Sequence, residues 1–420
     1  MMLTTILGLL DRFLDRLQLK GSLQITYPDG QTRRYGDGVG EFVHLELRNW
    51  KALWRIVVTP DPAVPEAYMD GDLVFHEGDP ITFLKVVYSG VSEAPAHDFH
   101  PIFSADKLRY LLRRIHQFNP QSRARANVKY HYDLSRTLYD LFLDEDRQYS
   151  CAYFENPQVS LEEAQIAKKR HLAAKLLLEP GMRVLDIGSG WGGLGLTLAG
   201  DYGADVRGVT LSDEQYGLSR RRAKEAGLED RARFDLIDYR EVDGQFDRII
   251  SVGMFEHVGV NHYGEYFNKA RTLLKDDGVM VMHTIGRTGP PSVTSAFIRK
   301  YIFPGGYIPA LSEIMAPVEH SGLHVTDVEV LTDHYAETLK AWRERFMARR
   351  DEAVALYDER FARMWEFYLA ASEAAFRYQD MVVFQVQLAK NKLSIPRTRD
   401  YITDFDRRHG SNQGGMRAAE

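Results

Sequence analysis

The stretch GMRVLDIGSGWGG at residues 181–193 has the composition of a turn that binds a ligand. Its apolar residues predict a strand that carries Asp186, and Gly188 and Gly190 follow before a helix that we expect to begin near Leu194. Such a turn presents free backbone N–H groups and the positive end of a helix dipole. Glycine lets a ligand approach the backbone, which a side chain would prevent. Because glycine-rich turns also form plain loops, the surrounding elements must decide between the two interpretations.

The elements around this turn predict a layered α/β fold. Residues 202–212 form a second candidate strand about twenty residues after the turn, as a βαβ unit requires. Residues 246–252 and 278–284 are two more, and 381–388 is a late, well-buried one. Together they predict a doubly wound, Rossmann-like α/β sheet with a helical cap.

The type of nucleotide follows from the ends of the first strands. An enzyme that uses NAD would show an acidic residue at the end of the second strand to hold the ribose. Here that strand ends in Thr210 and Leu211. The pattern instead resembles the turn of S-adenosylmethionine-dependent methyltransferases. Asp238 and Tyr239 then fall where such enzymes place an acidic residue and an aromatic ring around the adenine.

Composition sets broad limits on the class of protein. The chain has 420 residues, of which 44% are apolar, so two domains with real cores are expected. A net charge of −6 gives no global basic character, and nucleic acid is not an expected partner. The single cysteine, Cys151, excludes an intramolecular disulfide. No apolar run reaches the ~18 residues that cross a bilayer, and no metal site is predicted.

Residues 1–115 are expected to form a small α+β domain for binding, positioning or oligomerisation. Leucine and isoleucine at spacings of three and four predict an amphipathic helix over residues 3–17. Because its polar face mixes both charges, packing on its own domain is favoured over a place on a membrane surface. The other elements expected here are a hairpin at 23–35, strands at 42–48 and 53–58, and helices at 67–84 and 105–118.

The rest of the chain is divided by its composition. Residues 116–130 are polar and basic and are expected to be a linker, followed by a catalytic domain over 131–402. Within that domain we expect a helix at 160–178, an aromatic insertion at 290–310 that caps the cleft, and long helices over 335–378. Most aromatic residues of these helices are expected to pack in a core, and residues 403–420 to form a polar tail.

A set of motifs in this order resembles the cyclopropane-fatty-acyl-phospholipid synthase family, which includes the mycolic acid cyclopropane synthases. The resemblance covers nearly the whole chain. The motifs are AYMDGDL (67–73), YSCAYF (149–154), VLDIGSGWGG (184–193), GVTLSDEQ (208–215), MFEHVG (254–259), HTIG (283–286) and HYAETLKAW (334–342).

The resemblance implies methyl transfer from S-adenosylmethionine to a cis double bond of an acyl chain in a membrane phospholipid. An alkene is a poor nucleophile, so the electrophilic methyl must be held close and aligned. The resulting carbocation needs a dry, aromatic-lined pocket, and a base must remove a proton from the new methyl so that the ring closes. The family's base is a bicarbonate ion, and the matching residues are Cys151 and Ile285 through their backbones, Glu256, His283 and Tyr335.

The resemblance also implies a set of cofactor residues. Tyr149 and Ser150 match the positions at the methionine end, Gly188 and Gly190 the turn, and Thr210, Leu211 and Gln215 the ribose, with Asp186, Asp238 and Tyr239 completing the set. Tyr239 stands where many relatives have tryptophan, and it keeps an aromatic face. The N-terminal domain resembles a lipid-binding domain that docks on a bilayer and pairs subunits. A homodimer in the cytoplasm, peripheral at the inner face of the membrane, is therefore expected.

Several alternatives remain open from the residues alone. After the same carbocation, loss of a different proton would give a methylene- or methyl-branched chain. A methyltransferase for a small polar molecule would have a compact polar cap rather than the aromatic insertion. A non-catalytic lipid carrier would not need Glu256, His283 and Tyr335. Taken singly, a histidine that ends a strand is more often structural, and Cys151 lacks the partners of a nucleophile.

Overall fold

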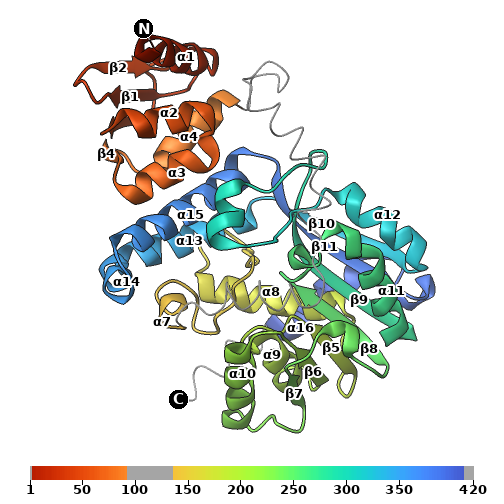
Figure 1. Cartoon of the computed structure of the whole chain (residues 1–420). Coiled ribbons are helices and arrows are strands. Elements are labelled where there is room, and N and C mark those ends of the chain that lie inside the picture. Colours follow the sequence, from red (N-terminus) through yellow and green to blue (C-terminus); the bar gives the residue numbers. More distant parts are fainter. Residues whose placement is uncertain (1, 92–135, 411–420) are drawn as a thin grey trace. The chain divides into compact units, whose positions relative to one another are not determined.

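The computed structural model describes residues 2–91 and 136–410 (Figure 1). The chain divides into two compact units. Of the described residues, the first contains 2–91, 292–304 and 336–381, and the second contains 136–291, 305–335 and 382–410. Each unit is built from segments that are distant in the sequence.

The first unit contains a four-stranded sheet of strand order β2-β1-β3-β4. β1 pairs antiparallel with β2 and parallel with β3, and Gly30 turns the chain of the predicted hairpin at a φ of 80°. The expected α+β character of this region is confirmed. Its elements are α1 (Met2–Arg16), β1 (Ser22–Thr26), β2 (Thr32–Tyr35), β3 (Phe42–Leu47), α2 (Trp50–Val58), α3 (Pro60–Asp70), β4 (Leu73–Glu77) and α4 (Pro80–Val91).

Two predictions for this region were wrong. The expected strand at 53–58 is the second half of α2, whose first turn is capped by Asn49 Oδ1 accepting the Ala52 N–H at 2.7 Å. The expected helix at 67–84 is two helices separated by β4, because Gly71 at a φ of 78° ends α3. The predicted helix at 105–118 and the linker at 116–130 lie outside the described residues.

Helix α1 is amphipathic as predicted, and its apolar face packs on its own unit. Leu10, Leu14 and Leu17 are buried in the core cluster beneath the small sheet. On the polar side, Asp11 accepts a hydrogen bond from Tyr35 Oη at 2.5 Å and pairs with Arg33 of β2. The interpretation as a packed helix is therefore supported over that of a helix on a membrane surface.

The first unit also holds the long aromatic helices and part of the expected insertion. These elements are a π-helical turn, Ile298–Ile302, α14 (Arg350–Leu356), α15 (Glu359–Tyr378) and α13 (His334–Ala348) from Ala336 onward. Trp342 and Trp365 are fully buried, which confirms core packing for them. Residues 292–304 cluster with this unit, since Asp61 Oδ2 accepts the Ala296 N–H at 2.7 Å and Glu66 Oε1 pairs with Lys300 Nζ at 2.7 Å. The continuous catalytic domain expected over 131–402 is therefore interrupted.

The second unit is built on a seven-stranded sheet of order β10-β11-β9-β8-β5-β6-β7. β5 pairs parallel with β6 and β8, which pair parallel with β7 and β9 respectively, while β10 and β11 are antiparallel. This confirms the Rossmann-like sheet. The strands are β5 (Arg183–Ile187), β6 (Asp205–Val209), β7 (Ala232–Asp235), β8 (Phe246–Val252), β9 (Leu274–Arg287), β10 (His324–Leu331) and β11 (Met381–Ala389).

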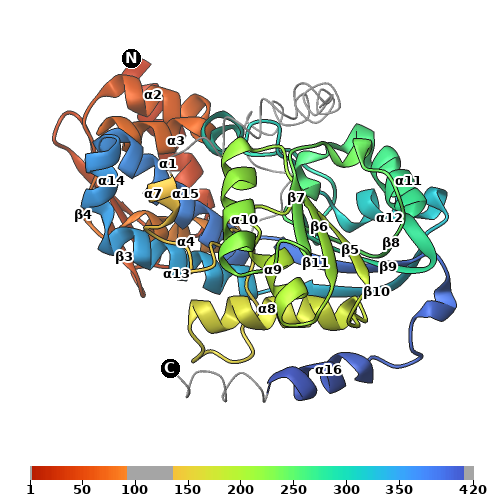
Figure 2. The ribbon, with the colours of Figure 1, turned by 90° about the horizontal axis from the view of Figure 1, so that it is seen from below.

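Helices lie on both faces of this sheet, and each face has its own core. Figure 2 shows α8 and α16 on one side and α11 and α12 on the other. The helices are α7 (Arg136–Tyr139), α8 (Leu161–Lys175), α9 (Gly193–Gly200), α10 (Asp213–Glu225), α11 (Tyr263–Leu273), α12 (Leu311–Ser321) and α16 (Asp400–Gly410). Short 3-10 turns are Tyr239–Glu241, Phe255–His257, Val260–His262 and Lys392–Ser394.

The boundary predicted for the polar tail at residue 403 falls inside α16. Phe405 is buried against Tyr202, with ring centroids 5.3 Å apart, and Asp406 Oδ1 accepts a hydrogen bond from Arg170 Nε at 3.1 Å. The helix is polar on one side only, which composition alone does not reveal. In the described part of the chain, no helix has the length and apolar character needed to cross a bilayer.

Candidate active site

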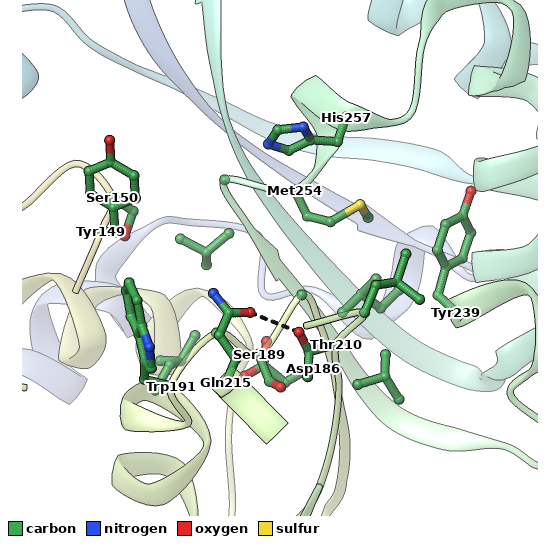
Figure 3. Close-up of a pocket in the computed structure, with 18 of the residues that line it drawn as sticks. Tyr149, Ser150, Asp186, Ser189, Trp191, Thr210, Gln215, Tyr239, Met254 and His257 are labelled. Carbon is green, nitrogen blue, oxygen red and sulfur yellow. Dashed lines mark hydrogen bonds between the residues drawn. The ribbon is translucent and has the colours of Figure 1, made fainter. Parts of the chain in front are cut away.

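A pocket lies at the carboxyl ends of β5, β6 and β8 in the second unit (Figure 3). The structure brings all of the predicted cofactor residues to its wall. They are Tyr149, Ser150, Asp186, Gly188, Gly190, Thr210, Leu211, Gln215, Asp238 and Tyr239. Residues from four separate segments therefore converge on one site, as expected where a doubly wound sheet binds a ligand.

The glycine turn after β5 has the conformation that its residue types indicated. Gly188 and Gly190 have φ values of 84° and 55°, where side chains are strained. A Cβ on Gly188 would lie 2.8 Å from Met254 Cβ, whereas a Cβ on Gly190, which lines the pocket, would have nothing within 4 Å. Gly188 is thus needed for packing, and Gly190 keeps the pocket wall open.

The end of β6 forms the next part of the wall. Thr210 Oγ1 donates to Gln215 Oε1 at 2.8 Å, as Figure 3 shows, and Ser212 Oγ accepts the Gln215 N–H at 3.3 Å. Both bonds fix the start of α10 against the strand end. Gln215 lines the pocket, and with its amide oxygen engaged its amide nitrogen is the side-chain group that can bind a ligand.

Asp238 and Tyr239 lie together after β7. Asp238 is buried and its carboxylate accepts from Arg240 Nε at 2.8 Å and Arg240 Nη2 at 2.7 Å. The Tyr239 ring lies 5.4 Å from that of Tyr266, and burial raises the pKa of its hydroxyl. This end of the pocket therefore offers a neutral aromatic face beside a charge-balanced carboxylate.

Asp186 is the most deeply buried acid of the pocket. It is 1% exposed, and its Oδ2 has no hydrogen-bond partner among the described residues. Burial raises its pKa to about 7, although the positive charge of Lys168 acts in the opposite direction. A buried carboxyl with a pKa near 7 and one oxygen without a hydrogen-bond partner is typical of a binding site.

Glu256 and Ile285, two of the residues assigned to the bicarbonate, are in direct contact. Glu256 Oε1 accepts the Ile285 N–H at 2.6 Å, while Oε2 has no partner in the described part of the chain. Burial raises the pKa of Glu256 to about 7, even though bonds from Ile285 and Thr284 lower it. Near neutral pH this carboxyl can therefore carry a proton on its free oxygen.

His283, Cys151 and Tyr335 are also buried, but none of the five bicarbonate residues lines the pocket. His283 Nδ1 lies 3.2 Å from Gln385 Nε2, and burial holds the pKa of the imidazole well below its usual value. The Cys151 thiol donates to the Ala152 carbonyl at 3.2 Å. The shared function of these residues stays a prediction.

Sequence reasoning missed several pocket residues, including Gln148, Trp191, Met254 and His257. Three of them lie within motifs used above, GSGWGG and MFEHVG, and Gln148 directly precedes YSCAYF. The signal was therefore proximity to a motif, but the direction of a side chain is not readable from sequence. Burial lowers the pKa of His257 to about 4, so this imidazole is neutral at physiological pH.

A family model described as mycolic acid cyclopropane synthetase matches residues 119–386. The chain belongs to this family. It is accordingly an S-adenosylmethionine-dependent methyltransferase of the cyclopropane synthase family, and its relatives include other lipid methyltransferases.

Three relatives show how far the likeness extends. Cyclopropane-fatty-acyl-phospholipid synthase of Escherichia coli strain K12 is 39% identical over 350 residues, which cover 82% of this chain and 87% of that protein. Tuberculostearic acid methyltransferase UfaA1 of Mycobacterium tuberculosis is 43% identical over 283 residues, covering 64% and 66%. The crystal structure of mycolic acid cyclopropane synthase CmaA1 complexed with SAH and CTAB has a TM-score of 0.61 at 35% identity, covering 65% of this chain and 99% of that one.

Proposed function

We propose that this family member transfers the methyl carbon of S-adenosylmethionine to a cis double bond of an unsaturated phospholipid acyl chain and closes a cyclopropane ring. The observation that carries the proposal is the extent of the likeness. The mycolic acid synthase CmaA1 covers 65% of the chain, whereas the phospholipid synthase of E. coli covers 82%. The extra coverage favours a phospholipid over a mycolic acid as the substrate.

The pocket residues fit S-adenosylmethionine. Tyr149 and Ser150 would hold its amino-acid end, the glycine turn its centre, Thr210, Leu211 and Gln215 its ribose, and Asp238 and Tyr239 its adenine. The open space at Gly190 and the unsatisfied Asp186 Oδ2 support this fit. When bound, the cofactor supplies an electrophilic methyl on a sulfonium. The chain's part is to hold that methyl in line with the alkene.

A bicarbonate ion held by Cys151, Glu256, His283, Ile285 and Tyr335 is our proposal for the base. A protonated Glu256 Oε2 can donate a hydrogen bond to an anion, which an ionised carboxylate would repel. His283 is neutral, and its Nδ1 lies against the Gln385 amide nitrogen, so Nε2 carries the ring proton and is a donor. A bicarbonate ion held by these residues would supply a proton acceptor for the new methyl.

The surroundings of Glu256 are suited to excluding water. The Phe255 ring stacks on Tyr263 at 4.2 Å, and Tyr266 lies 5.2 Å from Phe255. The Glu256 carbonyl accepts the Tyr307 N–H at 2.9 Å, which adds a fourth aromatic residue. A dry site prevents water from trapping a carbocation on the acyl chain, and aromatic faces stabilise positive charge.

We also propose that the protein acts at the surface of a bilayer, in the cytoplasm at the inner face of the membrane, and as a homodimer. We assign contact with the bilayer and with the second subunit to the first unit. This unit has its own sheet and core and contains none of the pocket residues. A surface-bound enzyme would reach acyl chains without extracting whole lipids.

A related lipid methyltransferase that makes a methylene- or methyl-branched chain is the second candidate. The 43% identity to the tuberculostearic acid methyltransferase favours it, because that value exceeds the identity to the phospholipid synthase over a shorter span. Ring closure and branching share the first step and differ in the proton that is lost.

Incubation with S-adenosylmethionine and unsaturated phospholipid vesicles tests the proposal, with saturated vesicles as the control. Cyclopropane proton signals in the extracted acyl chains, present only with the unsaturated vesicles, are the expected result. Vinylidene proton signals from a product of the same mass would show that the enzyme makes a branched chain and does not close a ring. Unmodified chains would contradict both candidates.

A further inference from the structure

The loop that carries Tyr149 and Ser150 is held in place by a helix that does not itself reach the pocket. Arg147, Gln148, Tyr149 and Ser150 line the pocket, and no described residue of α8 does. Yet Gln165 and Lys168, one turn apart on α8, are 1% and 0% exposed and face this loop. The position of four consecutive pocket residues thus depends on α8.

Gln165 binds the main chain of the loop. Its Nε2 donates to the Gln148 carbonyl at 3.2 Å and to the Ser150 carbonyl at 3.0 Å. One amide therefore fixes the backbone on both sides of Tyr149. Because this amide nitrogen bridges two carbonyls, the loop cannot shift along the helix without losing a buried bond.

Lys168 binds the side chains of the same two residues. Its Nζ donates to Gln148 Oε1 at 2.8 Å and to Ser150 Oγ at 2.9 Å. Burial lowers the pKa of Lys168 to about 8, while Asp144 and Asp146 act to raise it, so the ammonium form prevails at neutral pH. Asp186 of β5 also faces this charge.

The ammonium group decides how Ser150 can bind a ligand. A hydroxyl has one hydrogen and two lone pairs, and an ammonium can only donate. Ser150 Oγ must therefore accept from Lys168, and its own hydrogen is left to donate. Since Ser150 lines the pocket, that hydrogen is available to an acceptor such as a carboxylate.

We propose that Gln165 and Lys168 are positioning residues of the cofactor site, and that Lys168 makes the Ser150 hydroxyl a donor to the carboxylate of the bound cofactor's amino-acid end. The proposal rests on the proposed function, which places that end at Ser150. It assigns to α8 a role in selecting ligands that carry the amino acid.

The other contacts of the loop support a built site rather than incidental packing. Lys169 Nζ binds Asp146 Oδ2 at 2.6 Å, and Gln148 Nε2 donates to the same carboxylate at 3.0 Å. A Cβ on Gly193 would lie 2.4 Å from both Asp146 Oδ2 and Gln148 Nε2, so the loop needs glycine there to approach α9. The loop is therefore fixed on two sides.

The test compares two ligands by calorimetry. S-adenosylhomocysteine has the amino-acid end, and 5′-methylthioadenosine lacks it. Lys168→Met keeps a long, unbranched side chain but removes its donors, and Lys175→Met is the matched control. Lys175 is on the same helix and also fully buried, but it pairs with Glu329.

Lys168→Met should raise the Kd for S-adenosylhomocysteine about tenfold and that for 5′-methylthioadenosine less than about twofold. Lys175→Met should change both less than about twofold. An unchanged Kd for S-adenosylhomocysteine, or an equal rise for both ligands, would overturn the proposal. A wild-type protein that binds neither ligand would overturn the proposed function as well.

Ser150→Ala keeps the proposal falsifiable if Lys168→Met does not fold. Its loss of a single hydroxyl should give the same selective weakening toward S-adenosylhomocysteine. In the double variant the losses should not add, because both changes remove one interaction. Full additivity, or no selectivity in Ser150→Ala, would refute a shared role.

Discussion

Two buried carboxyl groups stand at the centre of the chemistry. Burial brings the pKa of both Asp186 and Glu256 to about 7, and each has one oxygen without a partner among the described residues. An acid that can be neutral at physiological pH can face an anion or give up a proton without a large energetic cost. Burial, rather than a neighbouring charge, raises the pKa of both groups and so suits them to a site that binds an anion and transfers a proton.

Glu256→Gln tests this interpretation at the residue that we assign to the base. The amide can still accept the Ile285 N–H but has no acidic proton, so turnover should fall about 100-fold or more. The Kd for S-adenosylhomocysteine should stay within about twofold, because Glu256 does not line the pocket. Steady-state kinetics and calorimetry measure the two effects. Glu265→Gln on the surface of α11 is the control, and wild-type turnover in Glu256→Gln would remove that residue from the site.

Gly190→Ala tests the glycine turn. The new Cβ points into open space that we assign to the ligand, so the Kd for S-adenosylhomocysteine should rise about tenfold or more. Gly181→Ala is the matched control, since Gly181 also has a positive φ, 80° against 55°, and open space around its Cβ, but lies outside the pocket wall. An equal loss of affinity in the two variants would mean that backbone strain, not the ligand's space, explains the effect. Unchanged affinity in Gly190→Ala would mean that the turn does not contact the ligand.

At the scale of elements, sequence patterns predicted the strands and the glycine turn well. β5, β6, β8 and β9 are buried central strands, and their apolar runs are bounded by clear turn residues. β7 was not anticipated because it has only four residues, ARFD, of which two are charged. α2 was misassigned because its first turn depends on the Asn49 cap, a side-chain contact that β-branched residues nearby obscure.

α8 shows why part of the site could not be predicted. It carries Lys168, Lys169, Arg170 and His171 in succession, and all four are buried. A run of charges normally indicates a solvated face. Here the partners lie far away in sequence, as with Glu329 and Asp406, so only the fold reveals that the charges are paired.

The pH dependence of stability tests this buried network. Burial would raise the pKa of Glu329, but His171 and Lys175 outweigh it and hold the pKa well below its usual value. Burial would lower the pKa of His171, but Asp406 and Glu329 raise it. The carboxylate stabilises the fold above its unfolded pKa of 4.5 and loses this effect as pH falls. The imidazolium stabilises it below 6.5 and loses its effect as pH rises through the folded pKa.

The free energy of unfolding of wild type should therefore exceed that of Glu329→Gln most between pH 4.5 and 6.5. The difference in the free energy of unfolding should narrow at lower pH, where Glu329 becomes protonated. It should narrow only in part at higher pH, because His171 loses its charge but Lys175 keeps its own. Urea unfolding at several pH values measures it, with Glu319→Gln on the exposed side of α12 as the control. A gap that does not change with pH would contradict an ionic network.

At the scale of the whole molecule, the pocket and the four-stranded sheet belong to different units. The pocket lies entirely within the second unit, and the first unit has a core of its own. Sequence composition predicted two domains, but it could not predict that residues 292–304 and 336–381 cluster with the first. Such contacts between distant segments have no local signal.

Leu14→Ala tests the separation. Leu14 is 6% exposed in the core of the first unit, so its loss should lower the free energy of unfolding by about 3 kcal/mol. The affinity for S-adenosylhomocysteine should not change, while vesicle binding should weaken. Calorimetric unfolding and co-sedimentation with vesicles measure these effects, and Asp15→Ala on the exposed side of α1 is the control. A matching loss of cofactor affinity would show that the units do not act independently.

The fate of the transferred methyl tests the central claim most directly. S-adenosylmethionine with a trideuterated methyl is supplied with unsaturated phospholipid vesicles, and the acyl products are analysed by mass spectrometry and NMR. We expect a ring that keeps two of the three deuterium atoms, because the base removes one from the incoming methyl. Acyl chains that keep all three, or that gain none, would contradict it.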